Sequence, residues 1–391
     1  MNVVVAGVSL IPFRTPGKSD TYDVMGAGAV RAALADAGLA LSDIQQAYAG
    51  YVYADSAAGQ TAIYEVGATG IPIINVNNYC ASGSTALWLG RQAIRSGAAD
   101  CVLVLGFEQM ARGAIGSVYS DRPDSLRHFT AARAAHHSPS DAPPAAQYFG
   151  DAGAAYLERY DADVSLFAQV AVKARRHAAA NPAAVFRDPF TVEEVLASPH
   201  VYGPLTRLQC CPPTCGAAAA ILCSEDFARS RGVDARVRIR AQAMTSDLSD
   251  TFAGDAMALV GAGIARRAAD LVYEEAGVGP GDIPVVELHD CFTANEVIAY
   301  ESLRLTPEGT SSGFVADGQN TYGGRVVTNP SGGLLSKGHP LGATGLAQCA
   351  ELVWQLRGTA GERQVEGARL GLQHNLGLGS ACVVTMYEAV A

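Results

Sequence analysis

The sequence predicts an α/β fold built from two related halves, with an extra segment inserted into the first half. Three observations support this prediction: alternating strand-like and helix-like segments, an internal duplication, and a long stretch with no counterpart in the second half. The composition fits a folded chain, because 49% of the 391 residues are hydrophobic and only 17% are charged, against ~25% in an average globular protein. Alternating strands and helices favour sheets that are covered by helices.

Three sequence echoes relate the two halves. The clearest is an Ala-Gly-x4-Asp-Ile pattern that follows a helix-like segment and precedes a strand-like one in both halves. The other two are a glycine-rich turn that opens a long helix, and an apolar strand-like run. Three echoes in the same order indicate duplicated βα units. The paired segments are 37–44 with 276–283, 81–94 with 342–356, and 216–225 with 379–388.

The halves differ between their last two predicted strands. More than a hundred residues separate Gly106 from Gly216, whereas a short turn makes the same connection in the second half. Long insertions in compact domains usually form lids or binding loops. We therefore expect an N-terminal half at 1–107 and 206–232, an inserted loop domain at 108–205 and a C-terminal half at 233–391.

Charge and hydropathy exclude several classes of function. The formal net charge is −10, from 28 Lys and Arg against 38 Asp and Glu, and the basic residues form no run that would attract nucleic acid. The longest apolar stretches are far shorter than the ~18–20 residues that a membrane-spanning helix needs. The N-terminus lacks the basic start of a signal peptide. We expect a cytoplasmic protein that binds neither nucleic acid nor a membrane.

The nine cysteines do not form the pattern of a disulfide framework, which agrees with a reduced compartment. Cys210, Cys211 and Cys215 are close enough in sequence to suggest a metal site. Two prolines, Pro212 and Pro213, interrupt the Cys-x₂₋₄-Cys spacing that zinc sites use. We therefore predict buried structural thiols here and no metal.

The first candidate site is Cys80 in the segment NNYCASGS at 77–84. A strand-like run leads into this cysteine, and an Ala- and Leu-rich helix begins directly after it. A thiol at a helix N-terminus lies at the positive end of the helix dipole, which can lower its pKa from ~8.5 to ~3.5–7.5. The pattern predicts either a reactive thiolate or, as the plainer alternative, a buried cysteine ahead of a helix.

The second candidate is His339, in a segment at 329–345 that contains five glycines and two prolines in 17 residues. Such a composition shapes a fixed loop that presents the histidine just before a helix. Histidine is the natural base for activating a thiol. A structural histidine remains the alternative.

Two further motifs lie at predicted strand ends. His289, Asp290 and Cys291 follow one another where a strand of the second half ends, which is typical of an active-site loop. The segment QHNLGLG at 373–379 joins two strands through a glycine turn. It is either a simple hairpin or a source of backbone N–H groups for an oxyanion.

Taken together, these motifs resemble the thiolase superfamily, and chiefly its sterol-carrier-type branch, also called lipid-transfer-protein-like thiolases. The GHPLGATG segment and the Cys-x-Ser pattern are specific to the superfamily, and HDCF and QHN are specific to the branch. The resemblance implies a duplicated βαβαβαββ unit, a five-layered αβαβα sandwich with an inserted loop domain, and a homodimer or homotetramer that acts on acyl-CoA. The matching segments are 77–86, 208–212, 287–292, 320–324, 329–351 and 372–379.

The resemblance also implies roles for three reactive side chains. Cys80 would be the nucleophile that holds the acyl group as a thioester. His339 would take the proton from Cys80 and help to stabilise a thioester oxyanion. Cys291 would be the second acid/base, because the C-terminal turn that carries this cysteine in ordinary thiolases has none in this chain.

The remaining implied roles concern oxyanion binding. His289 would help to build one oxyanion hole, and the backbone N–H groups of Cys80 and of Gly377 or Gly379 would build the other. His374 and Asn375 would border the active site and supply polar contacts. The chain departs from the family at Cys215, where an aspartate is common, and we expect altered local packing there.

The resemblance predicts CoA-dependent thiolytic cleavage of a 3-oxoacyl-CoA, with coenzyme A as co-substrate and no permanently bound cofactor. The substrates could include branched or sterol side-chain acyl groups. The same site run backwards would catalyse a Claisen condensation or C-acylation, and a non-catalytic acyl-CoA or lipid carrier is a third reading. A retro-aldolase that works with a small OB-fold partner protein is a fourth, although such relatives typically lack the nucleophilic cysteine.

Overall fold

The computed structural model describes residues 1–391 except 114–115, 118, 380 and 391. Ten of its twelve described strands form one sheet, which consists of two half-sheets of five with the same internal order. β3-β2-β4-β7-β1 in the first half is repeated as β10-β9-β11-β12-β8 in the second, and the half-sheets meet where Val4 of β1 pairs with Arg238 of β8. The strands of the first half are β1 (Val3–Leu10), β2 (Gln46–Gly50), β3 (Ile73–Val76), β4 (Cys101–Glu108) and β7 (Gly216–Ser224). Those of the second are β8 (Val237–Thr245), β9 (Val285–Glu287), β10 (Val327–Thr328), β11 (Leu370–Gly377) and β12 (Ala381–Ala389).

The helices repeat in the same way, so the predicted duplication is confirmed. In each half, one helix connects the first and second strands, one the second and third, and a long one the third and fourth. The predicted Ala-Gly-x4-Asp-Ile echo is the end of the first of these helices. Gly38 and Gly277 both cap it in the left-handed conformation, with φ of 66° and 64°, which favours glycine. The paired helices are α1 (Tyr22–Ala37) with α10 (Ala262–Ala276), α2 (Ala58–Tyr64) with α11 (Thr293–Ser302), and α3 (Ser82–Arg95) with α14 (Leu341–Arg357).

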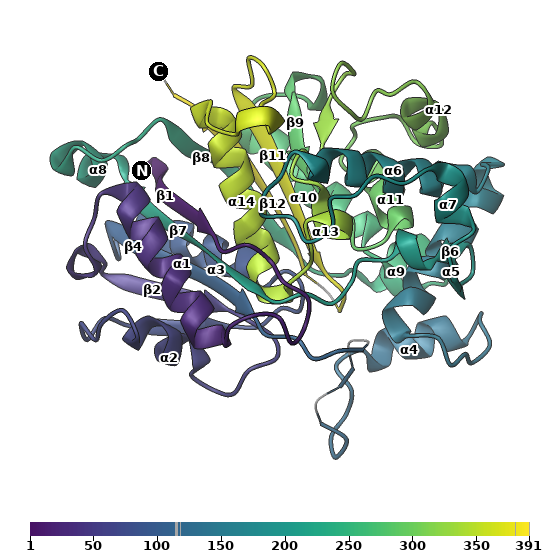
Figure 1. Cartoon of the computed structure of the whole chain (residues 1–391), viewed down its shortest axis with the longest axis horizontal. Helices are drawn as coiled ribbons and strands as arrows, with labels where there is room; N and C mark the ends of the chain where they lie inside the picture. The colour runs from purple at the N-terminus through teal and green to yellow at the C-terminus, as the bar shows by residue number, and fades with distance from the viewer. Residues whose placement is uncertain (114–115, 118, 380, 391) are drawn as a thin grey trace.

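α3 and α14 form the central layer of the sandwich (Figure 1). They pack against each other, and α14 also contacts β4 and β7 of the first half and β11 of its own half. Nearly every side chain of α14 is buried, as expected for a helix that is covered on all sides. α1 and α2 cover the outer face of the first half-sheet, and α10 packs on β8 and β12 of the second. This arrangement is the predicted αβαβα sandwich.

The segment between β4 and β7 begins and ends in the first half but packs on the second. Its helices α5 and α6 lie against α11. Lys173 of α6 is buried and forms an ion pair with Glu296 of α11, and its Nζ donates to Thr328 Oγ1 at 2.6 Å. This polar contact fastens the segment to the C-terminal half. Its elements are α4 (Arg127–Ala134), α5 (Pro144–Tyr160), α6 (Ser165–Ala179), α7 (Val192–Leu196), β5 (His200–Tyr202) and β6 (Leu205–Thr206).

The boundaries of an inserted domain at 108–205 remain a prediction.

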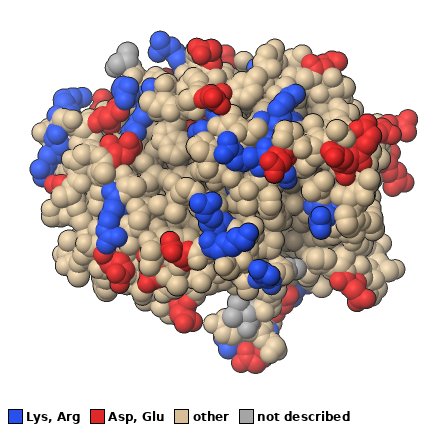
Figure 2. Space-filling view, viewed as in Figure 1, with Lys and Arg blue, Asp and Glu red and all other residues tan. Residues whose placement is uncertain are grey.

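Four shorter helices complete the set of described α-helices: α8 (Glu225–Arg231), α9 (Ala256–Leu259), α12 (Ser311–Ala316) and α13 (Gly333–Ser336). Among the described helices, none is both long and apolar enough to cross a membrane. On the face drawn in Figure 2, basic and acidic side chains are interspersed.

Candidate active site

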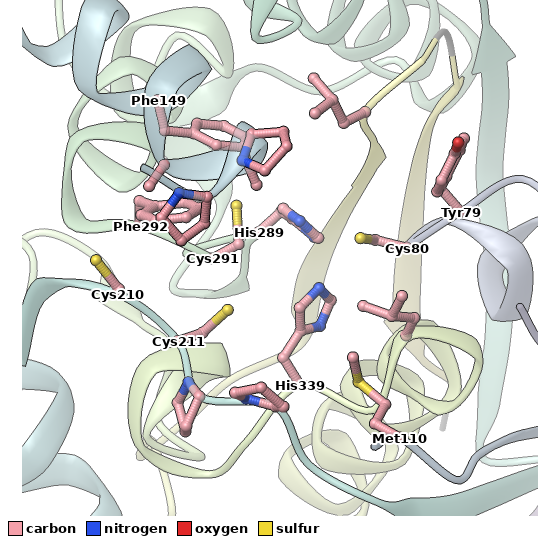
Figure 3. A pocket seen from close by; sticks show the side chains of 18 of the residues that line it. Tyr79, Cys80, Met110, Phe149, Cys210, Cys211, His289, Cys291, Phe292 and His339 are labelled. Carbon is pink, nitrogen blue, oxygen red and sulfur yellow. The ribbon is translucent and has the colours of Figure 1, made fainter. Parts of the chain in front are cut away.

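A cavity of about 290 Å³ lies where the central layer meets the segment between β4 and β7, and four predicted site residues line it. They are Cys80, His289, Cys291 and His339 (Figure 3). One ligand atom from each of Cys80, His289 and His339 lies within 4.8 Å of the other two. Residues from both halves therefore meet at one point, although nothing in their sequence positions requires it.

Glycines permit this meeting. Cys80 lies two residues before the start of α3, and His339 lies two residues before the start of α14, so the N-terminal ends of the two central helices must approach closely. A Cβ on Gly83 would lie 2.4 Å from the carbonyl oxygen of Gly342, and one on Gly106 would lie 2.2 Å from the same oxygen. Real Cβ atoms are not found at such distances, so only glycine fits at these two positions.

The hydrogen bonds of His339 fix the position of its ring proton. The Thr344 hydroxyl donates to the Pro340 carbonyl at 2.9 Å, so it accepts from His339 Nδ1–H at 2.7 Å. The ring of a neutral histidine carries one proton, and Nε2 is therefore unprotonated. Among the described residues, Nε2 has no hydrogen-bond partner. The geometry gives His339 a free lone pair beside Cys80, as a general base requires.

Burial sets the protonation states of this pair. Burial, together with the nearby Lys337 ammonium, lowers the pKa of His339 to about 3. Burial and the Glu108 carboxylate raise the pKa of Cys80 to about 12. The expectation of a lowered thiol pKa at a helix N-terminus is wrong, because loss of solvation and a buried carboxylate outweigh the helix dipole. At neutral pH the site rests as a thiol and a neutral imidazole, and the proton must move as the sulfur attacks.

His289 lies beside His339, with ring centroids 5.1 Å apart and planes at 82°. Its Nδ1 is 3.1 Å from Asn375 Nδ2, an amide nitrogen that can only donate. The ring proton of His289 is therefore on Nε2. Burial, and next the neighbouring His339, lower the pKa of His289 well below its usual value. A neutral ring with Nε2–H can donate to an oxyanion.

Cys291 is held by its neighbour in sequence. Asp290 is fully buried, and its Oδ1 accepts from the backbone N–H of Leu334 at 2.7 Å. The Asp290 side chain thereby ties the loop after β9 to α13. Burial and, secondly, the charges of Cys211 and Cys80 raise the pKa of Cys291 well above its usual value, so this thiol is a proton donor in the resting site. Cys382, the thiol nearest the C-terminal turn in sequence, is fully buried in the core instead.

The C-terminal turn lies behind this set. Leu378, which lies between Gly377 and Gly379 in the sequence, lines the cavity. Asn375 contacts His289 as described, and His374 Nδ1 accepts from the backbone N–H of His289 at 3.4 Å. The structure places both side chains in contact with His289, outside the residues that line the cavity. Their roles, and those of the two glycines in an oxyanion hole, remain predictions.

The sequence reasoning missed two features, one in the cavity wall and one outside the residues that line the cavity. Cys210 and Cys211 line it and are half-buried, so the expectation of buried structural thiols is wrong for these two. Glu108 is the other: this buried carboxylate accepts from the backbone N–H groups of Val52, Tyr53 and Gly342 at 3.0, 2.8 and 3.1 Å. Burial raises its pKa to about 7. Its position at the end of the apolar strand β4 is the only sequence signal.

Cys215, which departs from the family pattern, also acts near the cavity. Its sulfur accepts from the backbone N–H of Met110 at 3.2 Å and donates to the Met110 carbonyl at 3.5 Å. Met110 lines the cavity. A thiol, which can both accept and donate, therefore holds this turn where a carboxylate could only accept.

Two family models match most of the chain. Residues 3–226 match the family described as thiolase, N-terminal domain, and residues 248–388 match thiolase C-terminal domain-like. Sterol carrier protein 2 of Oryctolagus cuniculus is 49% identical over 391 residues, which covers 99% of this chain and 72% of the relative.

Two solved structures share the fold. The chain in the structure titled Ltp2-ChsH2(DUF35) aldolase has a TM-score of 0.83 at 24% identity, over 99% of this chain and 98% of that one. Human mitochondrial 3-ketoacyl-CoA thiolase in complex with CoA has a TM-score of 0.75 at 19% identity, over 100% and 98% of the two chains. At these identities the likeness concerns the fold alone.

Proposed function

The chain belongs to the thiolase family, and from that premise we propose that it is a degradative thiolase that cleaves a 3-oxoacyl-CoA with coenzyme A. The observation that carries the proposal is the convergence of Cys80, His339 and Cys291 on one cavity from three separate loops. A nucleophile, a base with a free lone pair and a second thiol acid are the groups that the two half-reactions need.

In the first half-reaction, His339 Nε2 takes the Cys80 proton as the sulfur attacks the 3-oxo carbon. The resulting alkoxide collapses, and the bond between C2 and C3 breaks. The acyl group stays on Cys80 as a thioester, and the departing enolate of acetyl-CoA or propanoyl-CoA takes a proton from Cys291. In this proposal His289 Nε2–H donates to an oxyanion during these steps, which is worth about 10²–10³ in rate.

In the second half-reaction, coenzyme A is the acceptor. Its thiol loses a proton to the Cys291 thiolate and attacks the thioester on Cys80. Cys80 leaves and regains its proton from His339, so every group returns to its starting state. The net products are the shortened acyl-CoA and acetyl-CoA or propanoyl-CoA.

The cavity walls support an apolar acyl group as substrate. Apart from the reactive set and Tyr79, the lining side chains are apolar or thiol groups, and the rings of Phe149 and Phe292 are stacked with centroids 4.8 Å apart. We include branched and sterol side-chain acyl groups in the proposal for this reason. Burial of a charged acyl substituent against such walls would be strongly unfavourable.

The alternatives use the same geometry differently. A Claisen condensation is the same chemistry in reverse, so the structure supports it equally. A carrier function would not need the aligned base and thiol acid. A retro-aldolase with a small partner protein finds support only in the fold of one neighbour, and the retained Cys80 argues against it.

Assembly as a homodimer or homotetramer is part of the proposal.

A substrate panel tests this proposal. Purified protein is given 3-oxoacyl-CoA esters from short chains to a steroid side chain, and loss of the 3-oxoacyl-CoA is followed with and without coenzyme A. We expect CoA-dependent loss with apolar chains, absent in Cys80→Ser. Cleavage of a 3-hydroxyacyl-CoA without coenzyme A would support the aldolase instead, and binding without turnover would support a carrier.

A further inference from the structure

One short segment contacts both catalytic loops of the C-terminal half. It runs from Cys210 to Thr214, between the last turn of the segment that follows β4 and the start of β7. We call it the strap. Its first four residues, Cys210 to Pro213, all line the cavity. The strap is thus a wall of the active site that comes from the N-terminal half.

The first part of the strap holds the loop of the predicted acid. Cys210 pairs with Phe292 in an antiparallel bridge, and the backbone N–H of Cys211 donates to the Cys291 carbonyl at 2.9 Å. In antiparallel pairing this register sets Cys211 opposite Cys291, with both side chains on one face. Both thiols face the cavity.

The last part of the strap holds the base. Pro213 pairs with His339 in a parallel bridge, and the backbone N–H of His339 donates to Thr214 Oγ1 at 2.6 Å. Thr214 is fully buried. Gly338, at φ 120°, permits the contact, because a Cβ there would lie 3.1 Å from Thr214 Oγ1.

Pro212 separates the two sets of contacts, and Pro213 belongs to the second set. The rings of both prolines fix the backbone dihedral φ. The separation of the two loops is therefore set by a stiff connection. The base is held twice: Thr344 of the C-terminal half fixes its ring, and Thr214 of the strap fixes its main chain.

We propose that Thr214 is a positioning residue for His339, and that through it the strap sets the base against Cys80. This inference rests on the proposed function of His339 as the base. Thr214 is not among the residues that line the cavity, so we expect its effect to pass through His339. Loss of one ordinary hydrogen bond predicts about a tenfold loss of rate.

The test compares Thr214→Val, which keeps the shape but removes the acceptor, with Thr214→Ser, which keeps the hydroxyl. Two rates are measured at pH 8: acylation of Cys80 by acetyl-CoA, and alkylation of Cys80 by iodoacetamide. The second does not depend on any acyl substrate, so it remains informative if the protein transfers no acyl group. Thr245→Val is the matched control, because Thr245 is a buried threonine on β8 that donates to Ile264 O at 2.9 Å.

We expect Thr214→Val to lower both rates about tenfold, Thr214→Ser to restore them, and Thr245→Val to leave them unchanged at a similar loss of stability. In a His339→Ala background, where acylation is lost, Thr214→Val should leave the alkylation rate unchanged, because the residue acts through the missing ring. Thr214→Ala serves the same comparison if the valine variant does not fold. A further tenfold loss of the alkylation rate in the His339→Ala background would overturn the proposal. So would unchanged rates in the Thr214→Val single variant.

Discussion

The two halves of the molecule place different chemistry at the same points of the same fold. After the third strand, the first half presents Cys80 ahead of α3, and the second half presents His339 ahead of α14. Because these helices are packed together in the central layer, the equivalent turns face each other. Duplication of one βα unit thus supplies a nucleophile and a base at two related positions.

The loops after the second strand differ more. In the first half, the backbone of Val52 and Tyr53 is bound by the buried Glu108 carboxylate. In the second half, the same loop carries His289 and Cys291. The first half has one reactive side chain and a polar anchor, and the second has three reactive side chains. The comparison teaches that the scaffold was kept in both halves while the chemistry became concentrated in one.

The protonation states of Cys80 and His339, which come from different halves, give the largest expected effect. If the pKa of Cys80 is about 12, its thiolate fraction rises tenfold per pH unit. Since the thiolate is the nucleophile, alkylation of Cys80 by iodoacetamide in His339→Ala, where no base takes the proton, should speed up about 10³-fold from pH 6 to pH 9. His339, with a pKa lowered to about 3, stays neutral over this range. In the wild type the neutral His339 takes the Cys80 proton throughout, so the rate should change far less. Peptide mapping gives the rate at Cys80 alone, and a flat rate from pH 6 to 8 in His339→Ala would contradict the raised thiol pKa.

Replacement of Cys291, the proposed acid from the C-terminal half, should separate acylation of Cys80 from proton transfer at the substrate carbon. Cys291→Ala is expected to lower turnover at least ~10² with the fold intact, because the enolate then lacks its proton donor. Slow acylation of Cys80 by a simple acyl-CoA should persist. Exchange of deuterium into C2 of acetyl-CoA is the direct readout. Unchanged exchange in this variant would mean that another group moves that proton.

The contact between the halves can be broken with one methyl group. In Gly342→Ala, the new Cβ would lie 2.5 Å from the carbonyl oxygens of Gly50 and Phe107, which predicts a loss of about 1–3 kcal/mol in stability. A shift of the base by about 1 Å can reduce turnover ~10². Urea unfolding and kcat measure the two effects.

The matched control is Gly263→Ala on α10, where a Cβ would meet nothing within 4 Å. This substitution should leave kcat unchanged and raise stability by up to about 1 kcal/mol. Equal effects at Gly263 and Gly342 would show that helix propensity, and not the contact between the halves, explains the result.

The smallest expected effect concerns the ring proton of the base. Thr344→Val removes the acceptor for His339 Nδ1–H and should lower kcat about tenfold, as expected for one hydrogen bond. KM should change little, because Thr344 does not line the cavity. Thr344→Ser should restore the rate, and a loss that the serine does not restore would point to packing instead.

Much of the architecture could be read from local patterns. The glycine caps at Gly38 and Gly277 and the strand-turn-helix patterns around Cys80 and His339 depend on neighbouring residues, so the sequence shows them directly. The gathering of Cys80, His289, Cys291 and His339 followed from family motifs, since spacing alone cannot bring distant loops together.

The electrostatics and the supports of the site could not be read in the same way. The direction of the Cys80 pKa shift depends first on burial and then on the Glu108 carboxylate, and both arise only in the folded chain. Thr214 looks like an ordinary residue before a strand, and its partner is 125 residues away. Cys210 and Cys211 were predicted to be structural thiols because Pro212 and Pro213 interrupt the spacing of a zinc site, and the sequence does not show that both line the cavity.

The most direct test of the central claim, that a nucleophile from one half works with a base from the other, is the mass of the intact protein after mixing with acetyl-CoA. The wild type should gain one acetyl group, which peptide mapping should place on Cys80. Cys291→Ala should gain it slowly, and His339→Ala should gain none, because nothing then takes the Cys80 proton. Acetylation of His339→Ala at the wild-type rate would contradict the account.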